Sequence, residues 1–173
     1  MNKFEVEQKY RIKNPAAIRR RLRSLKAKRV SSGHEKNELW DLEDIVRRKA
    51  SVLRLRTHDG KGTLTFKGPR LKSKFKKRLE LETGVDPQAA RMLLITLGFR
   101  VVARYEKQRE EYRLGPAHVT LDHVGKSGWF VEIETASAQI EKIAARLGLS
   151  AKDREERSYL EMIYGSRSVW RNK

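Results

Sequence analysis

Pairs of like-charged residues separated by a single residue recur along this sequence. In chain order they are Glu5 and Glu7, Arg54 and Arg56, Glu80 and Glu82, and Glu132 and Glu134. Carboxylate oxygens are the ligands that Mg2+ and Mn2+ prefer, whereas arginine binds phosphate through a fork of N–H donors. The chain has no cysteine, so a metal ion would be held by oxygen or by histidine. These residue types indicate a site for a hard cation together with a phosphorylated anion.

The spacing of the pairs is that of β-strands, in which alternate side chains point to the same face. Between Phe4 and Ile12 the charged residues fall on one face and mostly apolar residues on the other. The same division recurs at 52–57, 62–67, 78–82, 118–122 and 129–134. A further strand is predicted within 34–42, and the segment 105–110 is polar on both faces, which indicates a functional constraint. We therefore expect about eight strands.

Two arrangements of these strands satisfy the pattern. If the charged faces point to solvent, the apolar faces form the core of a two-layer α+β sandwich. If the sheet closes on itself, the charged faces line a wet interior and helices cover the apolar outside. Carboxylates from the first and last strands would then share one cavity with basic residues, and a metal ion and a polyphosphate would supply the counter-charges. The alternation alone leaves both arrangements open.

Helices are predicted where a capping residue and a proline precede apolar residues at helical spacing. They begin at Pro15 and Pro87, and two more are expected over about 136–147 and 151–164. The first helix has an arginine-rich face that fits either RNA or solvent. The basic segment 70–77 is expected to be a loop, and it could act as a lid, a nucleic-acid contact or a solvated connection. The histidines are expected at the surface or in turns, and they are His34, His58, His118 and His123.

The net charge of +18 requires anions to relieve the repulsion within a compact chain. Nucleic acid, an anionic membrane surface or a polyphosphate would each do so. The length suits one domain, which we place at 1–165, followed by a basic tail at 166–173. The sequence has neither a membrane-spanning apolar run nor the start of a signal peptide. We therefore expect a cytoplasmic protein without a membrane partner.

Several motifs occur together and in order along nearly the whole chain. They are Glu5-x-Glu7-x-Lys9, Leu53-Arg54-Leu55-Arg56, Lys67-Gly68-Pro69, Glu80-x-Glu82, Glu106-Lys107-x-Arg109, the run from Leu121-Asp122 through Gly128-x-Phe130-x-Glu132-Ile133-Glu134, and Arg157-Ser158-Tyr159. In order and spacing they resemble the CYTH family of triphosphate tunnel metalloenzymes, and within it the class IV adenylyl cyclases. One departure concerns Asn37 and Leu39, which stand where the family often has an acidic residue and a tyrosine. This departure leaves the nucleotide preference open.

The resemblance implies an α+β fold, an eight-stranded antiparallel closed β-barrel that forms a tunnel with a charged interior and helices packed outside. It also implies a role for each matching position. The metal ligands, for Mg2+ or Mn2+, would be Glu5, Glu7, Asp122, Glu132 and Glu134. The triphosphate would be bound by Lys9, Arg54, Arg56, Lys67, Lys107, Arg109 and Arg157. The residues expected to matter most for catalysis are Glu5, Glu7, Lys9 and Glu134. Glu80 and Glu82 are expected to position basic neighbours rather than a metal.

Two reactions fit such a site. A cyclase would convert ATP to cAMP and pyrophosphate, and ATP is the substrate that the resemblance favours. A triphosphatase would hydrolyse thiamine triphosphate, inorganic triphosphate or a nucleoside triphosphate. A third alternative is a basic nucleic-acid-binding module, which is less favoured because the sequence has no RNP-like aromatic strand and no helix-turn-helix signature. A dimer is compatible with the sequence, which does not specify the oligomeric state.

Overall fold

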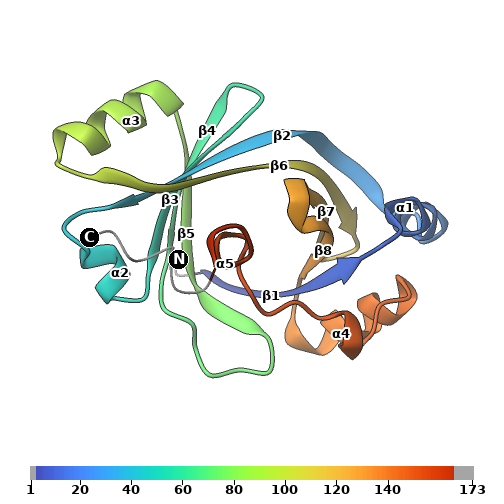
Figure 1. The fold of residues 1–173 in the computed structure, drawn as a ribbon. Helices are drawn as coiled ribbons and strands as arrows, with labels where there is room; N and C mark the ends of the chain where they lie inside the picture. The colour runs from blue at the N-terminus through green and yellow to red at the C-terminus, as the bar shows by residue number, and fades with distance from the viewer. Residues whose placement is uncertain (1–2, 166–173) are drawn as a thin grey trace.

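The strands form a closed antiparallel barrel, as the sequence predicts (Figure 1). The computed structural model describes residues 3–165. Its strands are β1 (Lys3–Ile12), β2 (Lys28–Asp41), β3 (Val52–His58), β4 (Lys61–Lys67), β5 (Lys76–Val85), β6 (Arg100–Leu114), β7 (Ala117–Val124) and β8 (Gly128–Glu134). Around the barrel they follow the order β1-β5-β4-β3-β2-β6-β7-β8. The predicted α+β barrel with helices outside is therefore confirmed.

The first strand closes the barrel because it pairs along both of its edges. Residues Lys3 to Glu7 pair with β5, and residues Glu7 to Ile12 pair with β8. Glu7 belongs to both pairings and lies opposite Glu134 of β8. The first and the last strand of the chain thus lie side by side at the predicted acidic site.

The hydrophobic core lies outside the barrel, between the strands and the helices. The outward face of β1 contributes Tyr10 to a buried cluster that also contains residues of β7 and β8. The helices α1 (Pro15–Ser24) and α4 (Ser137–Arg146) cover this cluster, with Ile18, Leu22 and Ile143 buried. A third helix, α3 (Pro87–Thr96), covers a second cluster around Trp40. Because the apolar faces are covered from outside, the charged faces are left to line the interior.

Local sequence explains where the helices begin and how one hairpin turns. Asn14 and Asp86 accept hydrogen bonds from the backbone N–H groups of Ala17 and Ala89, so each caps its helix as expected. Asp59 and Gly60 both have positive φ, which is the geometry of a tight turn between β3 and β4.

Several predicted boundaries were wrong. Lys76 and Lys77 begin β5 and do not belong to a loop, and β2 and β6 extend well beyond the predicted segments 34–42 and 105–110. A short helix that was not predicted, α2 (Ile45–Arg48), follows β2. The segment 151–164 is not one helix but the 3₁₀ turn η2 (Ala151–Asp153) and the helix α5 (Tyr159–Tyr164).

The break between η2 and α5 has a tertiary cause. The backbone N–H of Glu155 donates to the carbonyl of Lys9, and Tyr10 forms a β-bridge with Arg154, so this segment is held extended against β1. Another 3₁₀ turn, η1 (Gly125–Ser127), joins β7 to β8. The predicted tail at 166–173 lies outside the described residues. No helix within residues 3–165 is long and apolar enough to cross a membrane.

Candidate active site

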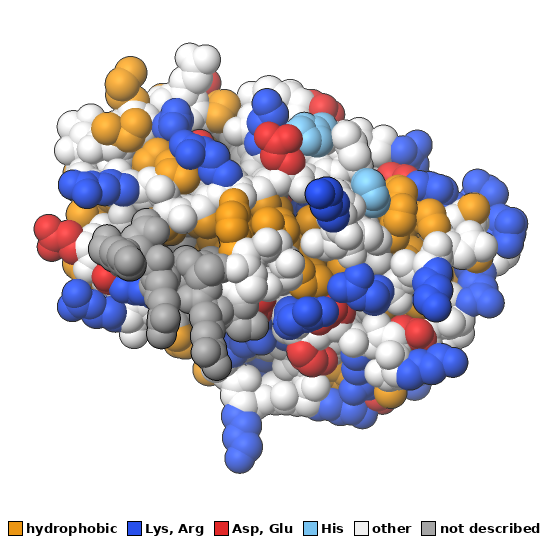
Figure 2. Space-filling view, viewed as in Figure 1, with side chains coloured by type: hydrophobic (Ala, Val, Ile, Leu, Met, Phe, Trp, Pro, Cys, Tyr) orange, Lys and Arg blue, Asp and Glu red, His pale blue; other side chains and the backbone are white. Residues whose placement is uncertain are grey.

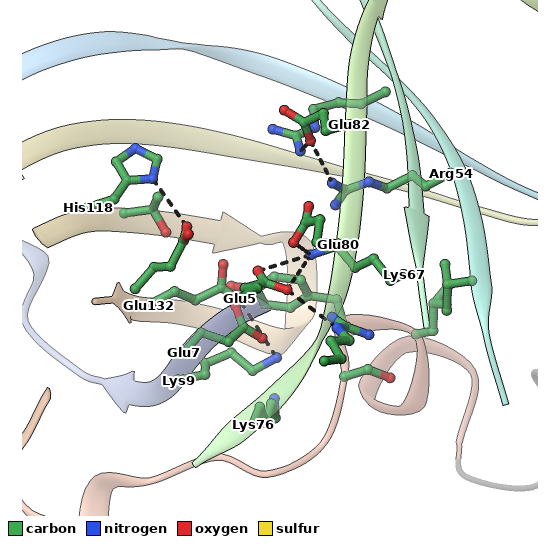
Figure 3. Close-up of a pocket in the computed structure, with 18 of the residues that line it drawn as sticks. Glu5, Glu7, Lys9, Arg54, Lys67, Lys76, Glu80, Glu82, His118 and Glu132 are labelled. Carbon is green, nitrogen blue, oxygen red and sulfur yellow. Dashed lines mark hydrogen bonds and ion pairs between the residues drawn. The ribbon is translucent and has the colours of Figure 1, made fainter. Parts of the chain in front are cut away.

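The barrel encloses a cavity of about 640 Å³ whose lining is strongly charged. Among the described residues, the lining includes ten lysines and arginines, six glutamates and one histidine. These are Lys9, Arg54, Arg56, Lys67, Arg70, Lys76, Arg78, Lys107, Arg109, Arg113, Glu5, Glu7, Glu80, Glu82, Glu132, Glu134 and His118. They come from strands far apart in the sequence (Figure 3). The i, i+2 pairs therefore face inward and toward one another.

Carboxylates gather where β1 meets β8, and we call Glu5, Glu7, Glu132 and Glu134 the acidic corner. Glu7 lies opposite Glu134 in the register, and Lys9 lies opposite Glu132. Burial, and then the negative charges of Glu132 and Glu5, raise the pKa of Glu7. Burial would also raise the pKa of Glu132, but Lys107, Arg109 and Lys9 outweigh it and hold that pKa well below its ordinary value, so the uncompensated negative charge of this corner lies at Glu7.

Glu5 is held by basic residues from β4 and β5. Its carboxylate accepts from Lys67 Nζ at 2.9 and 3.0 Å and from Arg78 Nε at 3.4 Å. Lys67 also contacts Glu80 at 2.9 Å. Burial raises the pKa of Glu5 despite the opposing charge of Lys67. The contact of Glu80 fits the expectation that this residue positions a basic neighbour.

The strands β3 and β4 supply a basic wall. Arg54 Nη2 donates to Thr65 Oγ1 at 3.3 Å and lies 3.9 Å from Glu82. Arg56 contacts Glu82 at 3.3 Å and Glu35 at 3.4 Å. In each guanidinium group the Nε is buried without a hydrogen-bond partner within the described structure. Both side chains line the cavity, where their guanidinium groups can donate hydrogen bonds to an anion.

A second basic group on β6 surrounds two buried carboxylates. Arg109 donates in a fork to Asp122, from Nε at 2.7 Å and Nη2 at 2.6 Å, and Nη2 also reaches Glu132 at 2.7 Å. Lys107 Nζ lies 3.0 Å from Asp122 and 3.4 Å from Glu35. Burial alone would raise the pKa of Glu35, but Lys107, Arg109 and Arg56 outweigh it and hold this pKa below its ordinary value. Glu35 was not identified from the sequence.

Lys9 lies between the acidic corner and this basic group. Its Nζ is 4.0 Å from Glu132 and 3.9 Å from the ring centre of Tyr159. Burial lowers the pKa of Lys9 to about 8. The Tyr159 hydroxyl donates to Asp122 at 2.7 Å, so the helix α5 holds the ring in place. Lys9 can therefore hold a proton at neutral pH and release it more readily than an exposed lysine.

His118 corrects the expectation that all four histidines lie at the surface or in turns. It lines the cavity from β7, with one ring nitrogen 3.7 Å from Glu111 and the other 3.7 Å from Glu134. The carboxylates of Glu111 and Glu134 raise the pKa of His118 to about 9. Alternation places His118 on the face of Thr120 and Asp122, which is the signal that identifies it as an inward residue.

Most of the predicted site residues converge on one cavity, and two do not line it. Asp122 is fully buried behind the lining, where Arg109, Lys107 and Tyr159 occupy its oxygens. Arg157 lies about half exposed beside a separate pocket and pairs with Glu155 at 2.7 Å. Sequence reasoning assigned no site role to Lys76, Arg78 and Arg113, although all three alternate with charged neighbours on β5 or β6.

The acidic corner fits a divalent cation by its chemistry. Glu5, Glu7, Glu132 and Glu134 present hard oxygen donors from two paired strands. The raised pKa of Glu7 shows that added positive charge would be stabilising there. Within residues 3–165 no three acidic or histidine side chains already stand in metal-binding geometry. Binding would require Glu5 to exchange its contact with Lys67 for the metal.

The chain is similar to several known proteins. The family model of the CYTH domain matches residues 3–159. The adenylate cyclase CyaB of Aeromonas hydrophila is 31% identical over 171 residues, covering 91% of this chain and 87% of that protein. The solved structure of the PH1012 protein from Pyrococcus horikoshii OT3 has a TM-score of 0.78 and 32% identity, covering 91% of this chain and 98% of that one.

A plant protein shares the fold at lower identity. HpAC1 from Hippeastrum, described as an adenylyl cyclase candidate with a dominant triphosphatase activity, has a TM-score of 0.71 and 18% identity. The alignment covers 93% of this chain and 96% of that one.

Proposed function

Because this chain belongs to the CYTH-domain family, we propose that it is a divalent-cation-dependent enzyme that converts ATP to cAMP and pyrophosphate inside the barrel. The observation that carries this proposal is the cavity of about 640 Å³, in which carboxylates on β1 and β8 face a basic wall from β3, β4 and β6. Such a lining offers separate places for a cation and for three linked phosphates. The identity of 31% with an adenylate cyclase favours cyclisation as the reaction.

In this proposal Glu5, Glu7, Glu132 and Glu134 hold Mg2+ or Mn2+. When bound, the cation supplies positive charge that polarises the phosphate under attack. The role of metal ligand predicted for Asp122 fits its contacts less well, because its two oxygens already accept from Arg109, Lys107 and Tyr159. We assign Asp122 to orienting these basic groups, which makes it a positioning residue.

The basic residues bind the triphosphate and align it. Arg54 and Arg56 line the cavity with their guanidinium groups, and Lys67 and Lys107 add point charges. In cyclisation, the ribose 3′-hydroxyl loses its proton to solvent and its oxygen forms a bond to the α-phosphorus, while the bond from that phosphorus to the bridging oxygen breaks and pyrophosphate leaves. Lys9, with its pKa near 8, lies where it can stabilise the charge that develops on the phosphates.

A nucleoside also needs an apolar surface, and one side of the cavity provides it. Leu39 and Leu160 form a buried cluster with Val52 and Tyr105 packed against it, and all four residues line the cavity. This surface favours a nucleotide over inorganic triphosphate as the substrate.

Triphosphate hydrolysis is the second candidate. The same carboxylates and basic residues would align water against the terminal phosphate. HpAC1 shares the fold and is described as having a dominant triphosphatase activity, which supports this alternative. The two reactions differ in whether the α-phosphate or the terminal phosphate lies at the acidic corner.

Incubating the full chain with ATP and Mn2+ and separating the products by chromatography tests the proposal. We expect cAMP and pyrophosphate in equal amounts. Orthophosphate without cAMP would reject the cyclase and leave a triphosphatase, and no turnover of ATP, tripolyphosphate or thiamine triphosphate would reject both.

A matched pair of variants on β6 tests the site itself. Arg109→Gln removes the fork inside the barrel, whereas Arg104→Gln removes an exposed arginine that pairs with Glu38 on the outside. We expect turnover to fall at least about 100-fold in the first and to change less than about twofold in the second. Equal effects would contradict the placement of the reaction in the tunnel.

A further inference from the structure

The tunnel accounts for only a small part of the net charge of +18. Its ten basic residues are opposed by six glutamates in the lining and by the buried Glu35 and Asp122 behind it. Most of the excess charge must therefore lie on the outer surface. The end of the molecule that carries α1, on the right of Figure 2, presents many lysine and arginine side chains and few acidic ones.

The helix α1 divides its arginines between two kinds of position. Ile18 and Leu22 point into the core. Beside this apolar stripe, Arg19 donates to Glu110 and Arg21 donates to the carbonyl of Leu147, so both are held against the protein. The opposite face carries Arg20 and Arg23, which are exposed and form no ion pair with any described residue. Arg19 and Arg21 therefore have a structural role, whereas the positive charges of Arg20 and Arg23 are not neutralised by any described residue.

The unpaired charge continues beyond the helix. We define the basic end as the exposed side chains of Lys13, Arg20, Arg23, Lys26, Lys28, Arg29 and Arg146. Lys28 pairs in register with Arg113 at the edge of the cavity lining, and Arg146 precedes the residue whose carbonyl binds Arg21. No member forms an ion pair in the described structure. The nearby Glu110 is already bonded to Arg19 and Tyr112. Such a surface repels itself unless an external polyanion covers it.

We propose that the basic end binds the sugar–phosphate backbone of double-stranded nucleic acid. Four of its seven side chains are arginines, whose forks match phosphate oxygens. A membrane fits less well, because Val30 is the sole large apolar side chain exposed between residues 13 and 30, and membrane-binding surfaces insert several. A single strand fits less well too, because this segment has no aromatic residue on which bases could stack. Contacts to the backbone alone predict binding without sequence preference.

Fluorescence anisotropy with a labelled mixed-sequence DNA duplex of about 20 base pairs tests this proposal. With about five phosphates contacted, the affinity should fall a few hundred-fold between about 50 and 200 mM salt. The variant Arg20→Glu/Arg23→Glu/Lys26→Glu removes part of the basic end without touching the tunnel. The matched control is Arg48→Glu/Lys49→Glu/Lys61→Glu, which makes the same change of charge on exposed residues at the end of α2 and at the start of β4, away from α1 (Figure 1).

We expect the first variant to bind the duplex at least about 30-fold more weakly and to reduce the salt slope by about three units. The control should bind within about threefold of the wild type. Unaltered melting temperatures and triphosphate turnover would show that both variants fold, and a failure of the tunnel chemistry would leave this comparison unaffected.

Three results would overturn the proposal. Equal losses in the two variants would show that only the net charge matters. Tighter binding to vesicles containing anionic phospholipid than to the duplex would identify a membrane surface. Absence of duplex binding at about 50 mM salt would exclude a nucleic-acid partner.

Discussion

Replacing Glu35 with glutamine should destabilise the protein and at the same time strengthen its binding of triphosphate. Glu35 is fully buried, with Arg56 and Lys107 each 3.4 Å away and Arg109 3.8 Å away. The substitution keeps the shape and removes the negative charge among three cations. Breaking a buried ion cluster in this way costs about 3 kcal/mol, which for a chain of this size lowers Tm by about 6–12 °C.

The gain in affinity follows from the same contacts. A phosphate that binds these cations from the cavity side would lie about 8 Å from Glu35, and at an effective dielectric constant of about 20 the two charges repel by about 2 kcal/mol. Allowing for screening by salt, the variant should bind tripolyphosphate about tenfold more tightly. A given concentration of tripolyphosphate should therefore raise the Tm of the variant by more than it raises the Tm of the wild type.

The assay is thermal unfolding and calorimetric titration with tripolyphosphate, both in EDTA so that no metal contributes. Glu38→Gln is the matched control, because Glu38 lies on the same strand but pairs with Arg104 and Arg91 on the outer surface. It should cost less than about 1 kcal/mol and leave affinity unchanged. If Glu35→Gln were as stable as this control and bound tripolyphosphate no more tightly, our account of Glu35 would be refuted.

Three further predictions concern the acidic corner and its neighbours. Glu7→Ala should abolish turnover without lowering Tm at pH 7, because it removes a carboxylate whose pKa is raised by burial, Glu132 and Glu5; a lower Tm would contradict this. His118→Gln should lower the free energy of unfolding by about 2 kcal/mol near pH 6 and by little near pH 10, as measured by urea unfolding. The folded pKa of His118 is near 9 and the unfolded pKa is 6.5, so the protonated imidazole stabilises the folded state fully below pH 6.5, and this contribution is lost as the pH rises through 9. A cost that does not depend on pH would exclude the charge as the cause. Asp122→Asn should raise KM for the triphosphate at least about tenfold with no change in half-saturation by Mn2+, whereas a shift in the metal dependence alone would make Asp122 a ligand.

The sequence by itself determined which residues share a face. Alternation along a strand is a local property, so the order of the residues alone assigns the pairs Glu5 and Glu7, and Glu132 and Glu134, to one side of their strands. Capping residues and prolines likewise located the starts of α1 and α3, because those interactions involve residues a few positions apart.

The tertiary structure decided which way each face points and which side chains meet. The same alternation suits a sandwich or a barrel, and the choice depends on β1 pairing with both β5 and β8, which is a contact between the ends of the strand sequence. The roles of Glu35 and of Tyr159, which belongs to the motif Arg157-Ser158-Tyr159, were not predicted, for a related reason. Each takes its role from partners on other elements, Glu35 from Arg56 on β3 and Lys107 on β6, and Tyr159 from Asp122 on β7. Closing the barrel places these charges in a confined, partly desolvated space, and only there do their separations set pKa values and binding.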